Sequence, residues 1–312
     1  FTASATEANA AAILGAAAAA RARGRAPRLL VGAGEHPSVL QAAARAAREG
    51  ARIDAIPLDR RGVARIDEAP AGEADLLALQ LANNETGVIQ PLVEAAAAAR
   101  AAGAHLHCDA VQAAGKLDLG DVWARCDSLA ISAHKLGGLP GAGALALRRG
   151  SDLPALIPGH QERGLRGGTH ALPAIAAFGA VAEAALRERA SRLARLRVRT
   201  DRLERVLREV APDVVVAGAD APRLPGIVNA RFPGVDGELL LVALDLAGIA
   251  ASHGAACSTG AMEPSHVLLA MGLSKDEARG AIRFSLGPDT TEAEIAALAA
   301  ALPGALRSAR LG

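Results

Sequence analysis

The chain has 312 residues, 51% of them hydrophobic, and its 34 basic and 33 acidic residues leave a formal net charge of +1. A chain of this length can bury a large core and can form two domains. The balanced charge, with four Phe, one Trp and no Tyr, gives no electrostatic or stacking basis for binding nucleic acid or a membrane, so neither is expected as a partner.

Strand-like and helical patterns alternate along the first half of the chain. Apolar runs predict strands at residues 28–32, 76–81, 104–108, 128–131 and 143–147, with helices near residues 7–23, 37–49 and 92–102. This β/α alternation predicts an α/β fold, in which a mainly parallel sheet is covered on both faces. The alanine-rich runs lie within the helical stretches.

The second half of the chain has a different pattern. A long helical stretch rich in Arg and Glu covers residues 172–210, and it is expected to link two domains. Strands are expected at residues 214–216, 226–232 and 280–285, with helices at 237–246, 263–271 and 292–302. These elements predict a smaller α+β domain. We place the large domain at residues 1–188 and the small C-terminal domain at residues 189–312.

The chain opens inside a strand-to-helix turn. Thr6 stands where backbone N–H groups and the helix dipole would hold a phosphate, although an N-cap is the commoner use of such a threonine. A natural N-terminus rarely falls inside such a turn. We therefore expect a fragment whose N-terminal segment is missing.

One lysine stands out because of what surrounds it. Lys135 follows an apolar strand that ends in Ser132 and His134, and a turn rich in Gly and Pro comes after it. A lysine between a strand end and a tight loop is expected to be buried, and burial makes an amine nucleophilic toward an aldehyde. Ser132 and His134 are expected to reach a bound anion from one side. Alone, the lysine would be interpreted as a surface residue, but its upstream neighbours argue against that.

Those neighbours are Asp109 and Gln112. Asp109 ends a predicted buried strand, and ligands of open α/β sheets bind at such strand ends. A carboxylate there can bind the protonated ring nitrogen of pyridoxal 5'-phosphate (PLP), and Gln112 can donate to the ring's phenolate oxygen. A metal site is the alternative, but His105 and His107 share one strand face while Cys108 points to the other, so no metal is expected.

Eight sequence blocks, in order, resemble the cysteine desulfurases of the NifS/IscS type. These belong to the class V aminotransferase group of fold-type I PLP enzymes. The blocks are residues 2–9, 35–39, 83–87, 107–112, 132–135, 161–169, 254–267 and 282–287. The resemblance implies the PLP-dependent transferase fold, with a seven-stranded type of sheet in the large domain.

The resemblance also implies a role for each matching residue. Lys135 would link covalently to PLP, Asp109 would bind its ring nitrogen and Gln112 its phenolate oxygen. His36 would stack on the ring and carry a proton. Asn84 would orient cofactor or substrate. The phosphate would be held by Ala5, Thr6, Ser132 and His134, and the substrate carboxylate by Arg283. Thr169 would reach the phosphate of a neighbouring subunit, which implies a homodimer.

Three of these residues have ordinary structural alternatives. His36 precedes Pro37 and could serve at the entry of a helix. Arg283 could pair with a structural carboxylate, although a guanidinium also suits a bidentate grip on a substrate carboxylate. Asn84 lies in a sequence typical of turns.

Cys257 indicates which reaction to expect. It lies among Gly, Ala and Ser residues that would permit a mobile loop, and a thiol carried to the cofactor could accept sulfur. The expected reaction converts L-cysteine to L-alanine and leaves a persulfide on Cys257. A sulfur-acceptor protein would then receive the sulfur, for iron-sulfur cluster assembly or tRNA thiolation.

The other two cysteines, Cys108 and Cys126, are expected to be buried core thiols. Three widely spaced cysteines are typical of the reducing cytoplasm rather than of a disulfide framework. Three other functions stay open: a selenocysteine lyase, another class V aminotransferase, and an inactive scaffold homologue.

Overall fold

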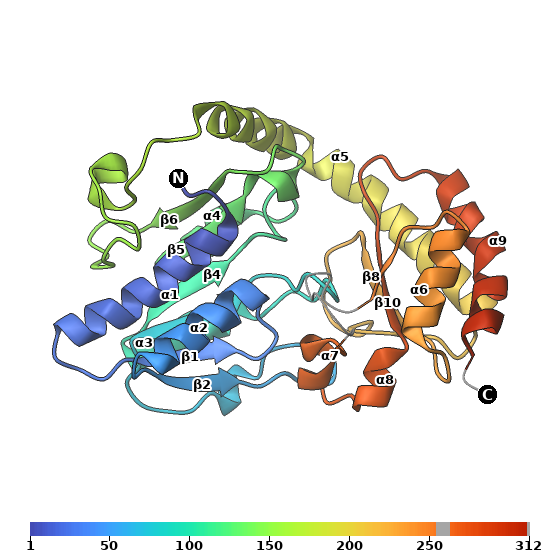
Figure 1. Cartoon of the computed structure of the whole chain (residues 1–312), viewed down its shortest axis with the longest axis horizontal. Coiled ribbons are helices and arrows are strands. Elements are labelled where there is room, and N and C mark those ends of the chain that lie inside the picture. The colour runs from blue at the N-terminus through green and yellow to red at the C-terminus, as the bar shows by residue number, and fades with distance from the viewer. Residues whose placement is uncertain (254–262, 311–312) are drawn as a thin grey trace. The chain divides into compact units, whose positions relative to one another are not determined.

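The computed structural model describes residues 1–253 and 263–310, which divide into two compact units (Figure 1). The first unit comprises residues 1–57, 64–83 and 90–189. The second comprises residues 58–63, 84–89 and 190–312. The two short segments, 58–63 and 84–89, were not predicted to belong to the second unit.

The first unit contains a six-stranded sheet in the order β2-β1-β3-β4-β5-β6. Neighbouring strands are parallel except β6, which runs antiparallel to β5. The strands are β1 (Arg28–Gly32), β2 (Arg52–Ile56), β3 (Leu76–Gln80), β4 (His105–Asp109), β5 (Ser128–Ser132) and β6 (Gly143–Leu147). The expected mainly parallel α/β sheet is confirmed, with six strands rather than seven in the described residues.

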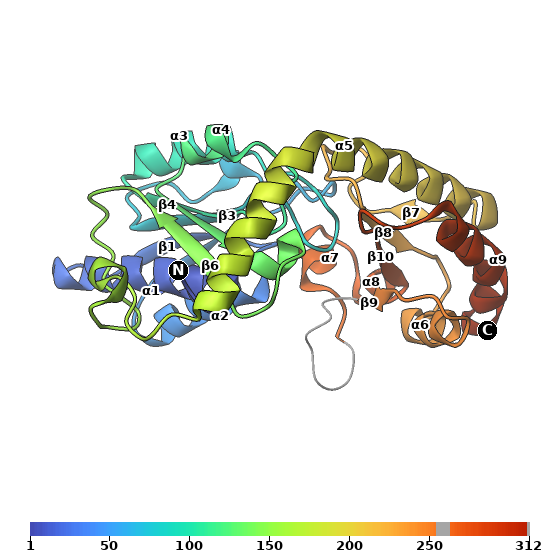
Figure 2. The same cartoon turned by 90° about the horizontal axis from the view of Figure 1, so that it is seen from above.

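Helices cover both faces of this sheet. Figure 2 shows α1 and α2 on one face and α3 and α4 on the other. The helices are α1 (Ala5–Ala22), α2 (Pro37–Arg48), α3 (Leu92–Ala102) and α4 (Leu119–Trp123), with short 3₁₀ turns η1 (Ile66–Glu68), η2 (Ala133–Leu136) and η3 (Gln161–Gly164). Leucines of β1 and β3 pack against the small side chains of α1 and α2, which lets these helices lie close to the sheet.

Local sequence signals explain several of the helix ends. The side chain of Ser4 caps α1 by accepting from the backbone N–H of Glu7. Pro37 occupies the first turn of α2, where its missing N–H costs no hydrogen bond. Gly103 ends α3 in the left-handed conformation, at φ 65°.

The second unit contains a four-stranded antiparallel sheet in the order β7-β8-β10-β9. Its strands are β7 (Val215–Val216), β8 (Ile227–Arg231), β9 (Ser252–His253) and β10 (Ala281–Ser285). Its helices are α6 (Gly237–Leu246), α7 (His266–Ala270), α8 (Lys275–Arg279) and α9 (Glu292–Ala309), and α5 (Leu172–Val210) continues into it from the first unit. The core lies where α5, α6 and α9 pack on β8 and β10.

The C-terminal helices differ from their predicted limits. The helix expected from residue 263 begins at His266, because Ser265 caps it. Helix α9 continues past Pro303 to Ala309, although a proline removes one helical hydrogen bond. Leu298, Leu302 and Leu306 lie on its buried face, and this burial keeps the helix continuous. No helix in the described residues is long and apolar enough to cross a membrane.

Candidate active site

Lys135 lies in the 3₁₀ turn η2, which follows β5 directly. Ser132 ends the strand, is buried, and its Oγ lies 2.8 Å from Nδ1 of His134. Ala133 turns into the core, so His134 and Lys135 project outward and are exposed. The expected burial of Lys135 is therefore wrong, because a single turn cannot bury Ala133 and the two residues after it on the same side.

Asp109 ends β4, the parallel neighbour of β5. The carboxyl ends of parallel strands meet at one edge of a sheet, so Asp109 and the turn carrying Lys135 belong to the same edge. The carboxylate is 6% exposed. Its Oδ1 accepts from the backbone N–H of Val111 at 2.9 Å, and its Oδ2 accepts from Nδ2 of Asn9 at 2.7 Å.

The environment of Asp109 acts on its charge in two directions. Burial raises the pKa of Asp109, while the hydrogen bonds from Val111 and Asn9 and the charge of His36 oppose that rise. No Lys or Arg of the described residues forms an ion pair with it. Such a buried carboxylate is suited to a cationic partner that arrives with a ligand.

Gln112 lies in the turn after β4, beside Lys116. Nζ of Lys116 lies 3.4 Å from Oε1 of Gln112. With the carbonyl oxygen facing this lysine, the amide –NH₂ of Gln112 remains a donor for another acceptor. Burial, followed by the charge of Lys135, lowers the pKa of Lys116 to about 8. Lys116 was not predicted as a site residue, and its position four residues after Gln112 is the sequence signal that could have identified it.

The start of α1 approaches the end of β5 through Gly143. The backbone of Thr2 exchanges hydrogen bonds of 2.9 and 2.8 Å with Gly143, which pairs with Ser132 in the sheet. Ser4 is the N-cap of α1, so Ala5 and Thr6 lie in its first turn and the N-cap interpretation of Thr6 is wrong. The exposed Thr6 and the first backbone N–H groups of a helix suit an anion.

A salt bridge holds a loop against this first turn. Arg166 donates to Oε1 and Oε2 of Glu7 at 2.8 and 3.2 Å. Burial favours the protonated form of Glu7, but the hydrogen bonds from Arg166 and Ala3 and the charge of Arg166 outweigh it, so the pKa of Glu7 is lowered. Thr169, three residues after Arg166, is exposed.

His36 is the N-cap of α2. Its Nδ1 accepts from the backbone N–H of Ser38 at 3.1 Å and lies 2.8 Å from Oγ of Ser38. The half-buried ring therefore has the structural role that was the alternative for this residue. Capping uses only Nδ1, so it is compatible with a role for the rest of the ring at the cofactor.

Asn84 and Arg283 belong to the second unit, where they contact each other. Arg283 on β10 donates to the backbone oxygen of Asn84 at 3.3 Å and to Oγ of Ser252 at 3.1 Å. Its buried Nε has no hydrogen-bond partner, and no carboxylate pairs with it, among residues 1–253 and 263–310. The structural carboxylate considered for Arg283 is therefore absent from this part of the chain. Cys257 lies outside the described residues.

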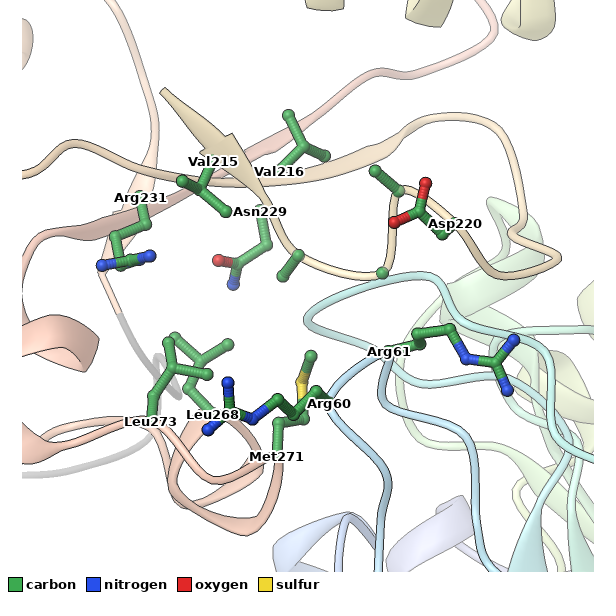
Figure 3. Close-up of a pocket in the computed structure, with 13 residues that line it drawn as sticks. Arg60, Arg61, Val215, Val216, Asp220, Asn229, Arg231, Leu268, Met271 and Leu273 are labelled. Atoms are coloured by element: carbon green, nitrogen blue, oxygen red, sulfur yellow. The ribbon is translucent and has the colours of Figure 1, made fainter. Parts of the chain in front are cut away.

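A pocket of about 170 Å³ lies on the face of the second sheet that also carries Arg283. Figure 3 shows Asn229 and Arg231 of β8 above Arg60, Leu268 and Met271. Asn229 is the strand partner of Arg283. None of the predicted site residues lines this pocket, and we assign no role to it.

Comparison with known proteins identifies the family. Residues 1–298 match the aminotransferase class-V family. A cysteine desulfurase from Klebsiella pneumoniae is 43% identical over 275 residues, covering 86% of this chain and 68% of that protein. A cysteine desulfurase from Gluconacetobacter diazotrophicus is 40% identical, covering 99% and 78%. A solved NifS-like protein matches with a TM-score of 0.87 at 29% identity, covering 98% of this chain and 82% of the other.

The chain belongs to the aminotransferase class-V family. Within that family it is similar to the cysteine desulfurases, and the resemblance to the NifS type is confirmed.

The family implies a PLP-dependent enzyme, and the described residues fit that cofactor. The first unit offers a buried carboxylate for a ring cation, an exposed lysine at the same sheet edge, and hydroxyl and backbone N–H donors at the start of α1 for a phosphate. The amide of Gln112 adds a donor for the phenolate oxygen.

Proposed function

We propose that the chain is a PLP-dependent cysteine desulfurase that converts L-cysteine to L-alanine and leaves the sulfur as a persulfide on Cys257. One observation supports this most directly: Asp109 is buried and hydrogen-bonded on both oxygens, beside the strand that leads to Lys135. The identity of 43% to a cysteine desulfurase selects this reaction among those open to PLP enzymes.

The predicted site residues of the first unit each have a role in this proposal. PLP, when bound, supplies an aldehyde for amines and a ring that takes up electron density. Asp109 holds the ring nitrogen, Gln112 donates to the phenolate oxygen, and Ala5, Thr6, Ser132 and His134 hold the phosphate. Nζ of Lys135 takes the proton from Cα of the substrate, and His36 stacks on the ring and moves a proton.

The second unit supplies the remaining groups. Arg283 binds the carboxylate of L-cysteine, supported by the buried Nε that has no partner in the described residues. Asn84, whose backbone oxygen holds Arg283, helps to orient the ligands.

The sulfur transfer balances without an added oxidant. The thiolate of Cys257 attacks the sulfur of L-cysteine, an S–S bond forms, and the substrate C–S bond breaks. The β-carbon takes a proton and becomes the methyl group of alanine, so one thiol and one cysteine give one persulfide and one alanine. Cys108 and Cys126 are unsuited to this step. Burial raises the pKa of Cys126 to about 11 and that of Cys108 well above the usual range, so neither forms a thiolate readily.

Substitution of Cys257 tests this function. Cys257→Ser should bind PLP and L-cysteine but form no persulfide and release little alanine, as measured by mass spectrometry and amino-acid analysis. Cys126→Ser is the matched control and should keep persulfide formation. Normal release of alanine by Cys257→Ser would favour an ordinary class V aminotransferase or an elimination instead.

The cofactor assignment has its own test. Reduction of the PLP-loaded protein with borohydride should attach the cofactor to Lys135, and peptide mass spectrometry should locate it there. Label on another lysine would overturn the assignment, and failure to bind PLP would favour the inactive scaffold. Relative rates on cysteine and selenocysteine separate the desulfurase from a selenocysteine lyase.

The proposal extends to partners and location. It includes a homodimer in which Thr169 serves the neighbouring site, a sulfur-acceptor protein for iron-sulfur cluster assembly or tRNA thiolation, and a cytoplasmic location. The three widely spaced cysteines, two of them free and buried, support a reducing compartment. Trapping the protein that receives the persulfide would identify the acceptor.

A further inference from the structure

A set of polar side chains, most of them buried, is connected to Asp109 through Asn9 of α1. We call it the Asn9 network: Asn9, His36, Ser38, His107, Asp109 and Ser128. Asn9 is 1% exposed, and His107 and Ser128 are fully buried. Buried polar groups are costly unless they are hydrogen-bonded, and Asn9 has a partner for each of its amide atoms.

Both the –NH₂ group and the oxygen of the Asn9 amide are hydrogen-bonded. Nδ2 donates to Oδ2 of Asp109 at 2.7 Å and to Oγ of Ser38 at 2.9 Å. Oδ1 lies 3.0 Å from Nε2 of His107. The orientation of the amide follows from the carboxylate, which accepts and does not donate, so the –NH₂ group must face Asp109.

This orientation determines where the neighbouring protons lie. Because Oδ1 of Asn9 accepts, His107 carries its proton on Nε2, and its Nδ1 accepts from Oγ of Ser128 at 2.9 Å. Because Oγ of Ser38 accepts from Asn9, its single proton is directed to Nδ1 of His36, 2.8 Å away. In its neutral form, the ring of His36 therefore carries its proton on Nε2.

We infer that Asn9 is a positioning residue for two groups of the active site. Through Nδ2 it holds the carboxylate of Asp109 as an anion in one orientation, and through the hydroxyl of Ser38 it directs a second donor, beside the backbone N–H of Ser38, to Nδ1 of His36, which favours the proton on Nε2. The inference rests on the proposed function, in which Asp109 faces the ring nitrogen and His36 moves a proton.

The hydrogen bond between His107 and Asn9 opposes a flip that would exchange the oxygen and nitrogen of the Asn9 amide. Burial, followed by the charge of His105, lowers the pKa of His107 to about 3, so the ring stays neutral at physiological pH. A neutral ring whose Nδ1 accepts from Ser128 can only donate from Nε2. Donation from Nε2 of His107 to Oδ1 of Asn9 therefore agrees with the orientation that Asp109 sets, with both N–H bonds of the amide toward Asp109 and Ser38.

Two variants of Asn9 separate this role from space filling. Asn9→Asp has nearly the same shape but offers no donor to Asp109, while Asn9→Ala leaves a small cavity. If Asn9 acts as a donor, PLP affinity should fall about tenfold in Asn9→Ala and further in Asn9→Asp, where two carboxylates meet. If it only fills space, Asn9→Asp should bind PLP more tightly than Asn9→Ala.

Ser38→Ala tests the second arm and keeps the contact between Asn9 and Asp109. It should bind PLP nearly as well as the wild type, while the pH dependence of kcat/KM shifts because Nδ1 of His36 loses its hydroxyl donor and keeps only the backbone N–H of residue 38. PLP affinity is measured by equilibrium dialysis below the unfolding temperature of each variant. Thr200→Ala, which removes a buried hydroxyl of the second unit outside the Asn9 network, is the control for a loss of stability that leaves PLP affinity unchanged.

The outcomes distinguish this inference from the proposed function. Wild-type affinity for PLP in Asn9→Asp, or an unchanged pH profile in Ser38→Ala, would overturn the corresponding arm and leave the desulfurase function standing. A wild-type chain that binds no PLP would overturn both. Should Asn9→Asp fail to fold, the affinity of Asn9→Ala relative to Thr200→Ala decides the first arm.

Discussion

The charge of Asp109 depends on buried side chains on the protein side of its carboxylate rather than on groups on the side proposed to face the ligand. Another buried carboxylate, that of Glu35, belongs to the same surroundings. It is 1% exposed, and its Oε1 accepts from the backbone N–H of Gln80 at 2.6 Å. Burial raises the pKa of Glu35 to about 8, the backbone hydrogen bond opposes that rise, and the charge of Asp109 adds to it. At neutral pH Glu35 is therefore protonated.

A protonated Glu35 predicts how stability changes with pH. The contribution of protonated Glu35 to the free energy of unfolding is fully present below pH 4.5 and is lost as pH rises to about 8. The reason is that Glu35 releases its proton at a lower pH in the unfolded chain than in the folded protein. In this window the free energy of unfolding should fall by up to about 1.4 kcal/mol per pH unit. Glu35→Gln, which keeps an acceptor for Gln80, should remove this slope in denaturant titrations at several pH values. An equal slope in both proteins would contradict the assignment.

At the residue scale, the sequence offered candidates for the groups proposed to face the ligand, but not for the side chains that support them. Asp109 was identifiable because it ends a buried strand. Asn9 was not assigned a role, because a polar residue among the buried alanines of a helix does not indicate its partners. Those partners, Ser38 and His107, come from distant parts of the sequence and meet only in the fold.

At the element scale, apolar segments bounded by turn signals were predicted most closely. β1 and β6 have the predicted bounds, since hydrophobic residues and turn signals mark them. β2 was missed because Arg52 and Asp54 interrupt its apolar pattern, whereas β6, at the other edge of the sheet, is made of Gly, Ala and Leu only. β9, with two residues, is too short to give a pattern.

The contact between β6 and the start of α1 gives a prediction about an element. A Cβ added to Gly143 would lie 2.5 Å from the carbonyl carbon of Ser4 and 2.8 Å from the nitrogen of Ala5. Gly143→Ala should therefore displace the first turn of α1, lower stability by about 1–3 kcal/mol and weaken PLP binding. Urea unfolding and equilibrium dialysis measure the two effects.

Gly179→Ala in α5 is the matched control, because nothing lies within 4 Å of its added Cβ. It should stabilise the protein by about 0.5–1 kcal/mol, since alanine is the better helix former. Unchanged PLP affinity in Gly143→Ala would show that Gly143 does not position the phosphate site.

At the scale of the whole molecule, the chain divides into two compact units. The first holds the residues assigned to the cofactor, and the second holds Asn84 and Arg283. The sequence predicted a boundary near residue 189 because the β/α alternation ends in a long helix. It gave no sign that residues 58–63 and 84–89 belong with the second unit, since tertiary contacts decide that assignment.

The proposed homodimer predicts complementation between two defective chains. Lys135→Ala removes the amine of its own site, and Thr169→Ala removes the phosphate contact that the chain gives to its neighbour. In a mixed dimer, the Thr169→Ala chain keeps Lys135 and receives an intact Thr169 from its partner, so one of the two sites is complete. Refolding equal amounts of both chains together should restore about a quarter of wild-type alanine formation, because half of the dimers are mixed. If Thr169 served its own chain, the mixture would show only the averaged activity of the separate mutants. Light scattering on the same samples would verify that dimers are present.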